Sequence, residues 1–274
     1  MGLAKDIEVR PISASDARRV VKAIHYSGKA VSNSQLHLGV FLHGKCGGAM
    51  QFGPPLVRRQ SIRLVEGTAW HGFLELNRMA FADWLPRNSE SRALGYAMRW
   101  IWRQYPWVEW VLSFADGTQC GDGTIYRAAG FVLTGIKKNT SIWAVPGGGG
   151  VVSRTSLEDG KSKKEQQRAR TIARQTHTKG SRIMETGAAS MRPYREAGFA
   201  PLPGYQLRYV YFLNPEARLR LTVPELPFSE IARVGAGMYR GVPRAGSIAA
   251  DAPSVQEGEG GSSPTPALHQ ARLA

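Results

Sequence analysis

The most constraining feature of the sequence is a strand, a turn, a helix and a second strand that follow one another near the middle of the chain. Residues 108–115 are mostly apolar, which is typical of a strand buried on both faces. Asp122 and Gly123 favour a turn, residues 124–129 fit one short helix closed by a glycine, and residues 131–136 begin another strand. A chain with this succession of elements is expected to form an α/β domain.

The residues before this segment supply the remaining elements of such a domain. Apolar patterning predicts a strand at 6–11, a helix at 13–24, a hairpin within 38–52 and a strand at 72–81. Four apolar side chains then share one face of a further helix, which is expected to lie on the sheet: Leu94, Ala97, Met98 and Ile101. The predicted order is β-α-β-β-β-α-β-α-β.

Changes in composition divide the chain into four parts. The first domain is expected to span residues 1–146, because a run of four glycines follows it. Residues 154–182 contain nine Lys or Arg and only three acids. This predicts a basic, helical insertion at 147–200 that contacts nucleic acid. An alternating aromatic strand within 201–244 is expected to join the first domain's sheet. Gly, Ser, Pro, Ala and Glu dominate residues 245–274, which predicts a disordered tail.

The balance of charge indicates a polyanionic partner. The 36 Lys and Arg outnumber the 21 Asp and Glu, so the net charge is +15 and the pI is near 10.2. Because such a surface can neutralise phosphate groups, it indicates nucleic acid as the partner. The alternative is a basic surface that only keeps the protein in solution. The sequence has only two cysteines and shows no export signal, which predicts a protein of the cytoplasm. It also has no apolar run long enough to span a membrane, so no membrane association is expected.

The central segment also carries the clearest chemical motif. The apolar strand ends in Ser113 to Asp116, and the helix after it carries the pattern Tyr-x-x-x-Gly-Phe from Tyr126 to Phe131. This arrangement resembles the lower half of the active site in GNAT-type N-acyltransferases, which implies a mixed, mostly antiparallel central sheet flanked by helices. It also implies that Tyr126 protonates the departing thiolate of coenzyme A. The alternative is an ordinary half-buried helical tyrosine.

The segment expected to bind coenzyme A departs from that resemblance. GNAT enzymes usually carry glycines at the start of the central helix, where bare backbone amides bind the pyrophosphate. Residues 86–93 contain no glycine and place Glu90 where an anion would sit. This segment therefore argues against coenzyme A as the donor.

The first half of the chain, taken as a whole, resembles the Mom family of phage DNA modification proteins. Six segments carry the resemblance: His25-Tyr26-Ser27, Leu38-Gly39-Val40-Phe41, Gly48-Ala49-Met50-Gln51-Phe52-Gly53, Glu75-Leu76-Asn77-Arg78-Met79-Ala80, Ser91-Arg92-Ala93-Leu94-Gly95 and Ser113 through Phe131. Residues 202–213 are in addition similar to the family's closing strand. The resemblance implies conversion of adenine N6 in duplex DNA to N6-carbamoylmethyladenine, which protects DNA from restriction enzymes. It also associates iron with the site.

Four side chains are predicted to carry the chemistry: Asp116, Tyr126, His25 and Arg78. Asp116 is expected at the carboxyl end of a strand, where it could accept a proton from adenine N6 or merely cap its own turn. Arg78 could bind phosphate or pair with Asp116 or Glu75. His25 could be a base, a metal ligand or a cation at a helix C-terminus. The family resemblance places His25 and Tyr26 at the active site.

The donor is expected to contact Ser91, Ser113 and Tyr26, although Ser91 could simply cap the helix. A carbamoylmethyl group holds two carbons and one nitrogen, as a glycine unit does, whereas acetyl-coenzyme A supplies no nitrogen. Glycyl-tRNA is therefore our hypothesis for the donor, and acetyl-coenzyme A is the alternative.

A duplex DNA substrate requires phosphate contacts, because extruding a base from the stack costs free energy. The predicted contacts are Arg87 and Arg92 together with Lys161, Lys163, Lys164, Arg168, Arg170 and Arg174 of the insertion, for which a solvated helix face is the alternative. Two other functions compete with DNA modification: an N-acyltransferase for a protein, a small amine or tRNA, and a DNA-binding protein without activity.

Overall fold

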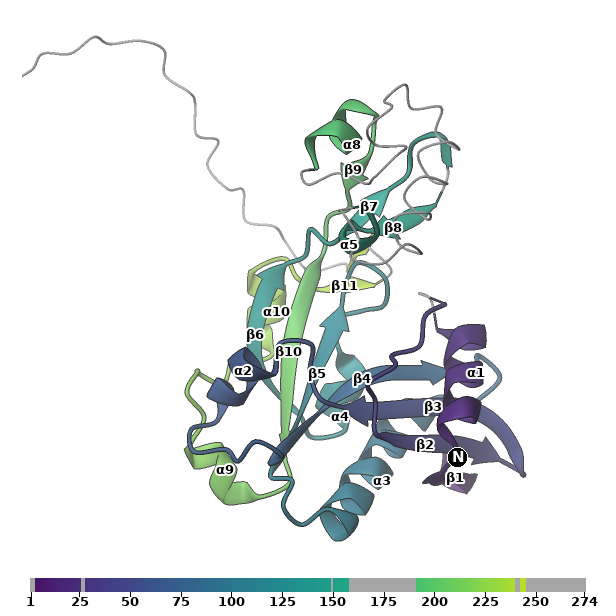
Figure 1. Cartoon of the computed structure of the whole chain (residues 1–274), viewed down its shortest axis with the longest axis vertical. Coiled ribbons are helices and arrows are strands. Elements are labelled where there is room, and N and C mark those ends of the chain that lie inside the picture. Colours follow the sequence, from purple (N-terminus) through teal and green to yellow (C-terminus); the bar gives the residue numbers. More distant parts are fainter. Residues whose placement is uncertain (1–2, 26–27, 149, 158–190, 240–241, 245–274) are drawn as a thin grey trace, which may run out of the picture.

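The main part of the protein is a seven-stranded sheet with the strand order β1-β2-β3-β4-β5-β10-β6 (Figure 1). The computed structural model describes residues 3–25, 28–148, 150–157, 191–239 and 242–244. The strands of the main sheet are β1 (Ile7–Pro11), β2 (Leu36–Leu42), β3 (Lys45–Gly53), β4 (Phe73–Phe81), β5 (Trp110–Asp116), β6 (Val132–Lys138) and β10 (Tyr205–Phe212). All neighbours are antiparallel except β4 and β5, which run parallel. This confirms the expected mixed, mostly antiparallel sheet.

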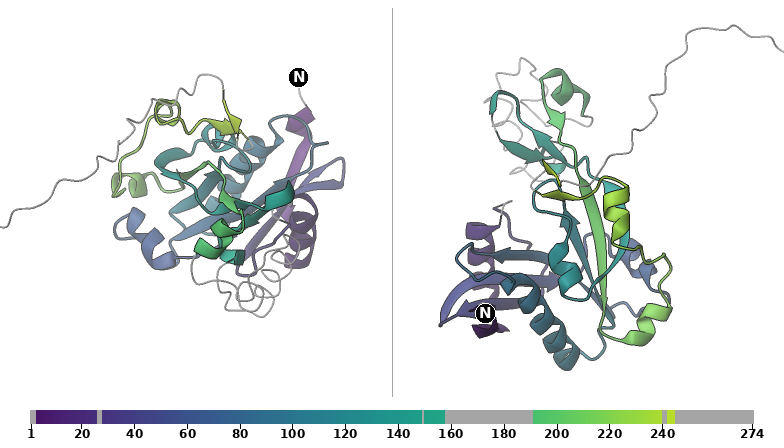
Figure 2. Two further views of the ribbon diagram at one scale, coloured as in Figure 1. Left: turned by 90° about the horizontal axis from the view of Figure 1, so that it is seen from above. Right: turned by 180° about the vertical axis from the view of Figure 1, so that it is seen from behind.

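Helices cover both faces of this sheet. They are η1 (Leu3–Asp6), α1 (Ala14–Ile24), α2 (Arg58–Ser61), η2 (Ile62–Leu64), α3 (Ser89–Gln104), α4 (Thr124–Ala128), α9 (Pro215–Leu219) and α10 (Ser229–Arg233). Helix α1 lies on one face, whereas α3 and α4 lie on the other (Figures 1 and 2). Helices α1, α3 and α4 occur where the sequence predicts them, and the single turns α2 and η2 are additions. Within the described ranges, no helix is long and apolar enough to cross a membrane.

Local signals explain the two longer helices. Ser13 caps α1, because its Oγ accepts a hydrogen bond from the Asp16 amide at 3.0 Å. In α3 the predicted apolar stripe is buried against the main core, where Leu94 and Ile101 meet sheet residues such as Val111. The helical period of 3.6 residues thus places these side chains on one buried face.

A small lobe with a second sheet lies beyond one end of the main sheet (Figure 1). It has the strand order β8-β7-β9 and consists of β7 (Ile142–Ala144), η3 (Pro146–Gly148), β8 (Val151–Ser153), α5 (Arg154–Leu157), α8 (Arg192–Glu196) and β9 (Ala200–Pro201). Trp143, Tyr194 and Phe199 belong to a separate core. The lobe begins at β7, ahead of the glycine run at which the sequence predicts a boundary. The predicted basic helix around residues 161–174 and the predicted tail lie outside the described residues.

Strand β10 completes the main sheet after the chain has passed through the small lobe. It joins this sheet, as the alternation of its residues predicts. The structure shows that it enters between β5 and β6 and is antiparallel to both. Its side chains Leu207, Tyr209 and Val210 are fully buried. Strands β5 and β6 are therefore joined only through β10. A last short pair, β11 (Met238–Tyr239) and β12 (Val242–Pro243), forms a separate two-stranded sheet.

Candidate active site

The parallel strands β4 and β5 separate in the middle of the main sheet (Figure 1). Only Phe73–Glu75 of β4 pair with Trp110–Leu112 of β5, although both strands continue beyond these residues. Further along, β4 remains paired with β3, and β5 remains paired with β10. No backbone hydrogen bonds therefore pair the carboxyl-terminal halves of β4 and β5 with each other. In open α/β sheets, ligands bind near the carboxyl ends of such strands.

A bulge in β4 sets the direction of the side chains at this separation. The register between β3 and β4 shifts between Gln51 and Phe52, so Asn77 has no partner in β3. After the bulge, Ala80 packs against α1. Because side chains alternate along a strand, Arg78 projects toward the same face as Ala80. The bulge thus brings Arg78 to the face that α1 covers.

Arg78 is fixed by backbone carbonyls. Its Nη1 donates to the carbonyl of Asn77 at 2.7 Å, and its Nε donates to the carbonyl of Lys29 at 3.3 Å. Within the described part of the chain, it forms no ion pair with Asp116 or Glu75, the two partners that the sequence suggests. Its positive charge is therefore not cancelled by a direct carboxylate contact.

His25 forms the C-cap of α1, next to Arg78. Burial and then the positive charge of Arg78 lower the pKa of His25 to about 4. At neutral pH the imidazole is therefore uncharged. This argues against His25 as a cation at the C-terminus of α1, whereas an uncharged imidazole can still act as a base or as a hydrogen-bond partner. Among the described residues, no group of three or more His, Cys, Asp and Glu side chains could hold a metal ion. The expected iron has no ligand set in this part of the protein.

Glu75 lies on β4 where its pairing with β5 ends. Burial raises the pKa of Glu75 to about 7, and a hydrogen bond with the Asn77 side chain and the charge of Arg78 oppose only part of that rise. A buried carboxyl group that titrates near neutrality beside an arginine is typical of functional sites. The sequence indicates Glu75 only as an ion-pair partner, because no local pattern reports burial.

Tyr126 lies on α4 and is buried against two other aromatic rings. Its ring centroid is 5.4 Å from that of Phe131 and 5.2 Å from that of Tyr209. Burial raises the pKa of Tyr126 to about 12; the nearby Ser113 hydroxyl opposes this, and Glu75 is among the charges that add to it. The Ser113 Oγ is itself buried and has no hydrogen-bond partner among the described residues. Unpaired buried polar atoms are rare and often mark functional sites.

Asp116 ends β5, as the sequence predicts. Its Oδ1 accepts one hydrogen bond from the Thr118 amide at 3.0 Å and another from Asn139 Nδ2 at 3.0 Å. The first is the turn cap that the sequence offers as the alternative role. The second comes from a residue just after β6, which no local pattern indicates. In the part of the chain that the structure describes, Oδ2 accepts no hydrogen bond and can meet a ligand.

The start of α3 is polar but offers no glycine-rich turn. The N-cap residue Asn88 is left-handed, with φ of 70°, and the Ser91 Oγ donates to its carbonyl at 3.3 Å. Burial and then the charge of Asp83 raise the pKa of Glu90. Ser91 is therefore engaged by its own helix, and an acid occupies the first turn, where an anion would need a positive potential.

Glu75 connects two groups of predicted residues, whereas the described contacts of Asp116, with Thr118 and Asn139, join it to neither group. His25 and Arg78 form one group on the α1 side, and Ser113 and Tyr126 form the other. Glu75 interacts electrostatically with both Arg78 and Tyr126. Tyr26 and the six basic residues predicted in the insertion lie outside the described residues: Lys161, Lys163, Lys164, Arg168, Arg170 and Arg174.

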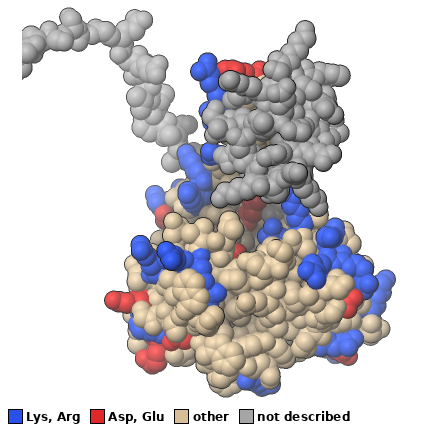
Figure 3. Space-filling model, viewed as in Figure 1, with Lys and Arg blue, Asp and Glu red and all other residues tan. Residues whose placement is uncertain are grey.

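Basic side chains gather over α1 and over α2 with η2, on either side of a surface with few charges (Figure 3). They are Arg18, Arg19 and Lys22 of α1, and Arg58, Arg59 and Arg63 of α2 and η2. Two of the predicted phosphate contacts are described. Arg87 is exposed and lies just before the start of α3, and Arg92 of α3 donates a hydrogen bond to the Tyr96 hydroxyl at 3.1 Å. No local pattern in the sequence indicates the residues of α1 and α2, because only the fold brings them to one face.

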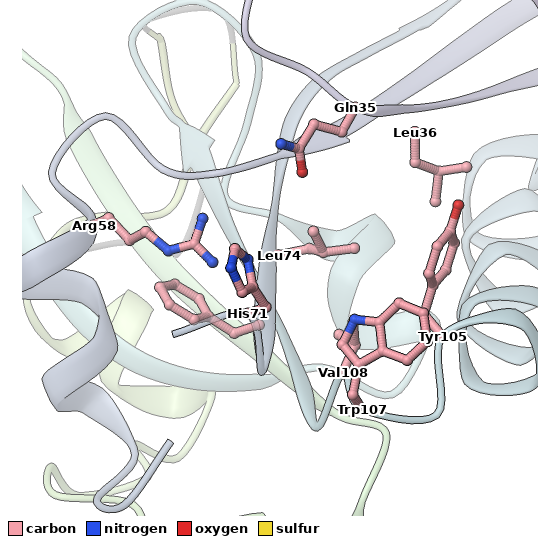
Figure 4. Close-up of a pocket in the computed structure, with 9 residues that line it drawn as sticks. Gln35, Leu36, Arg58, His71, Leu74, Tyr105, Trp107 and Val108 are labelled. Carbon is pink, nitrogen blue, oxygen red and sulfur yellow. The ribbon is translucent and has the colours of Figure 1, made fainter. Parts of the chain in front are cut away.

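A cavity of about 550 Å³ lies at the amino-terminal ends of β4 and β5 (Figure 4). Strand β3 ends opposite Glu75, so the first residues of β4 have no neighbouring strand on that side. The lining residues are Gln35, Leu36, Arg58, His71, Phe73, Leu74, Tyr105, Trp107 and Val108. None of the predicted site residues belongs to this set. Of the predicted residues, Arg78, Ser113 and Asp116 lie on the same two strands, toward their carboxyl ends.

Comparison with known families identifies the chain. A model described as the Mom protein family matches residues 6–230, which is most of the sequence. The chain belongs to the Mom protein family. Over 138 residues this Mom family member is 44% identical to the methylcarbamoylase Mom of Escherichia phage Mu, and the match covers 50% of the chain. It spans 57% of the length of that relative.

Solved structures similar to this Mom family member are distant in sequence. The N-acyl amino acid synthase FeeM from uncultured soil microbes is 14% identical, with 79% of this chain and 95% of that chain covered and a TM-score of 0.39. A GNAT family acetyltransferase from Brucella melitensis in complex with acetyl-CoA is 17% identical, with coverages of 46% and 82% and a TM-score of 0.31. The ribosomal-protein-S18-alanine N-acetyltransferase from Escherichia coli is 12% identical, with coverages of 48% and 82% and a TM-score of 0.34.

Proposed function

We propose that this chain is a phage-encoded enzyme that converts adenine N6 in duplex DNA to N6-carbamoylmethyladenine in the cytoplasm of a bacterial host, where the product protects DNA from restriction enzymes. The observation that carries this proposal is membership of the Mom protein family together with 44% identity to the methylcarbamoylase Mom of phage Mu. The separation of β4 and β5 supports it, since Glu75 of β4 interacts electrostatically with both Arg78 and Tyr126, and Asp116 ends β5.

In this proposal Asp116 accepts the proton that adenine N6 loses when it attacks the acyl carbon of the donor. Its Oδ1 is held by Asn139 and the turn amide, which leaves Oδ2 for the substrate. Fixing one oxygen orients the carboxylate before the substrate arrives, and this pre-organisation is what efficient proton transfer requires.

Tyr126 donates a proton to the leaving group of the donor. With a pKa of about 12 the phenol stays protonated at neutral pH, so it can act as an acid but not as a base. Arg78 offers its positive charge to the oxyanion that forms on the acyl carbon, and the neutral imidazole of His25 helps to position the substrate.

The donor in this proposal is a glycyl ester, as in glycyl-tRNA. Adenine N6 first displaces the ester oxygen, which leaves as an alcohol, and forms an amide with the glycyl carboxyl carbon. The free glycyl amine then attacks ring carbon 6 through a five-membered transition state, and the original N6 departs from that carbon as the amide nitrogen. The product is N6-carbamoylmethyladenine, with every atom supplied by adenine and one glycyl unit. The absence of glycines in residues 86–93 is consistent with a donor other than coenzyme A.

Nucleoside mass spectrometry of DNA from cells that express the chain tests the proposed reaction. We expect an adenosine heavier by one carbamoylmethyl group, and we expect Asp116→Ala to abolish it. Tyr126→Phe should lower its formation at least about 100-fold without lowering the melting temperature, because the ring contacts remain. Unmodified DNA from well-folded wild-type protein would contradict the proposal.

The donor is tested with purified protein, duplex DNA and glycine labelled with ¹⁵N. Label in the product should appear with charged glycyl-tRNA and disappear after digestion of the tRNA with ribonuclease. Full activity with acetyl-coenzyme A and no tRNA would overturn glycyl-tRNA as the donor and leave the DNA modification itself intact.

A further inference from the structure

The loop after β3 presents the most exposed large apolar side chain of the described residues. Leu56 is 95% exposed, and Val57 next to it is 47% exposed. Both follow Pro54 and Pro55, whose rings fix their own φ angles. An isolated leucine on a surface is ordinary, but the anchoring of its backbone and the charges beside it set this one apart.

Side chains and amides hold both ends of this loop in place. The carbonyl of Pro54 accepts hydrogen bonds from Asn33 Nδ2 at 3.2 Å and from Asn77 Nδ2 at 3.3 Å. The carbonyl of Val57 accepts the amides of Gln60 and Ser61, each at 3.1 Å. Leu56 therefore projects from a braced turn, and presenting it to a partner costs little conformational entropy.

Positive charge follows directly after the apolar tip. Arg58 folds back toward the sheet, with its guanidinium 4.9 Å from the centroid of the Trp70 ring. Arg59 and Arg63 are exposed, and neither forms an ion pair with a described residue. Two outward arginines beside an exposed leucine suit a partner that has an apolar interior and an anionic edge, and duplex DNA has this arrangement.

The loop is also tied to the candidate active site. Asn77, which braces Pro54, is the bulged residue of β4 between Glu75 and Arg78. Its Oδ1 in turn accepts a hydrogen bond from the Ser34 hydroxyl at 2.9 Å. The start of the loop that carries Leu56 is therefore held by the same short segment that carries Glu75 and Arg78.

We propose that Leu56 is a wedge that enters the base stack where the target adenine leaves it, while Arg59 and Arg63 contact the flanking phosphates. This inference rests on the proposed DNA modification and adds how the base is reached. Extruding a paired base from duplex DNA is costly, and an apolar side chain inserted between base steps offsets part of the lost stacking. The wedge is needed only for an adenine that is paired and stacked.

Leu56→Ala tests this proposal with two substrates that contain the same target adenine. One is a fully paired duplex, and the other places the adenine opposite an abasic site. On the paired duplex we expect modification at least about tenfold slower than wild type, since a loss of 1.4 kcal/mol corresponds to tenfold. On the unpaired adenine we expect the wild-type rate. The matched control is Leu219→Ala, because Leu219 is 81% exposed on α9.

A second readout reports extrusion without modification. With 2-aminopurine at the target position, its fluorescence should rise when the wild-type protein or Leu219→Ala binds, and should stay low with Leu56→Ala. Equal rates and equal fluorescence for Leu56→Ala and wild type on the paired duplex would overturn the wedge. Equal losses on both substrates would also overturn it. If wild-type protein raises the fluorescence and Leu56→Ala does not, but wild-type protein modifies neither substrate, the wedge stands and the proposed reaction fails.

Discussion

Burial shifts the three titratable side chains around the separation of β4 and β5 toward their neutral forms. It lowers the pKa of His25 to about 4, raises that of Glu75 to about 7 and raises that of Tyr126 to about 12. Arg78 is held by carbonyls and keeps its charge. At neutral pH the site is therefore more positive than its residue types suggest, and this favours anionic groups such as phosphates or a developing oxyanion.

Glu75→Gln should change how stability depends on pH. Since the pKa of Glu75 rises from its ordinary 4.5 to about 7, the folded protein binds a proton that the unfolded chain releases between these values. Wild-type stability should therefore fall as pH rises from 4.5 to 7, relative to the variant. In urea titrations we expect the variant to be more stable at pH 8 by at most about 3 kcal/mol, and equal to wild type near pH 4.5.

Glu66→Gln, which removes the carboxyl group of an exposed glutamate instead, is the matched control. If the free energy of unfolding depended on pH in the same way for wild type and Glu75→Gln, the Glu75 carboxyl group would not be buried in solution.

The hexapeptide Tyr-Arg-x-Ala-Gly-Phe occurs twice, once ending α4 and once ending α8, and folds in the same way both times. The amide of Phe131 donates to the carbonyl of Tyr126 at 3.0 Å, and that of Phe199 donates to the carbonyl of Tyr194 at 2.9 Å. The glycine has φ of 88° in the first copy and 87° in the second. The tyrosine and phenylalanine centroids lie 5.4 and 5.3 Å apart. Because the two copies lie in different cores, this turn is determined by its local sequence.

Two glycines that flank α4 give a matched pair of substitutions. Both have positive φ, 81° at Gly123 and 88° at Gly130, so alanine is strained at either position. A Cβ at Gly123 would overlap the Tyr209 ring, whereas at Gly130 the nearest atom is 3.5 Å away in the Tyr211 ring. In chemical denaturation we expect Gly130→Ala to cost about 1 kcal/mol and Gly123→Ala about 2 kcal/mol more. Equal costs would show that Tyr209 can yield without penalty.

The small lobe has a core of its own and is inserted between two neighbouring strands of the main sheet. Lys138 at the end of β6 pairs with Tyr205 at the start of β10, so the chain leaves the main sheet and returns to it at adjacent positions. The lobe's core around Trp143 and Tyr194 is separate from the main core. The insertion therefore takes the place of a hairpin turn.

Replacing residues 140–203 with Asn-Gly should leave the main sheet folded. Asn139 and Gly204 are kept, because the Asn139 amide donates to the Gly204 carbonyl at 2.8 Å and its side chain holds Asp116. Thermal unfolding should remain cooperative. In anisotropy titrations we expect weaker DNA binding and a shallower salt dependence, since the segment removed contains the basic stretch. Unchanged affinity would show that the insertion contributes no phosphate contacts.

The sequence by itself determined what depends on neighbouring residues. The apolar stripe of α3, the strand that ends at Asp116 and the turn after Tyr126 all follow from side chains within a few positions of each other. The order of the main elements, including the return of the chain at β10, follows from the same periodicities. These are properties of short segments. The mixed, mostly antiparallel sheet was expected instead from the resemblance to GNAT enzymes, and the roles of the site residues stay predictions.

Only the tertiary structure decided which of these residues meet and what surrounds them. The carboxylate of Asp116 is held by Asn139, 23 positions away, and burial in the folded protein raises the pKa of Glu75 to about 7. The carbonyl of Pro54, two residues before Leu56, accepts a hydrogen bond from Asn77, 23 positions away. Periodicity reports which way a side chain points along its own element, whereas burial and hydrogen-bond partners arise between residues that the chain brings together only when it folds.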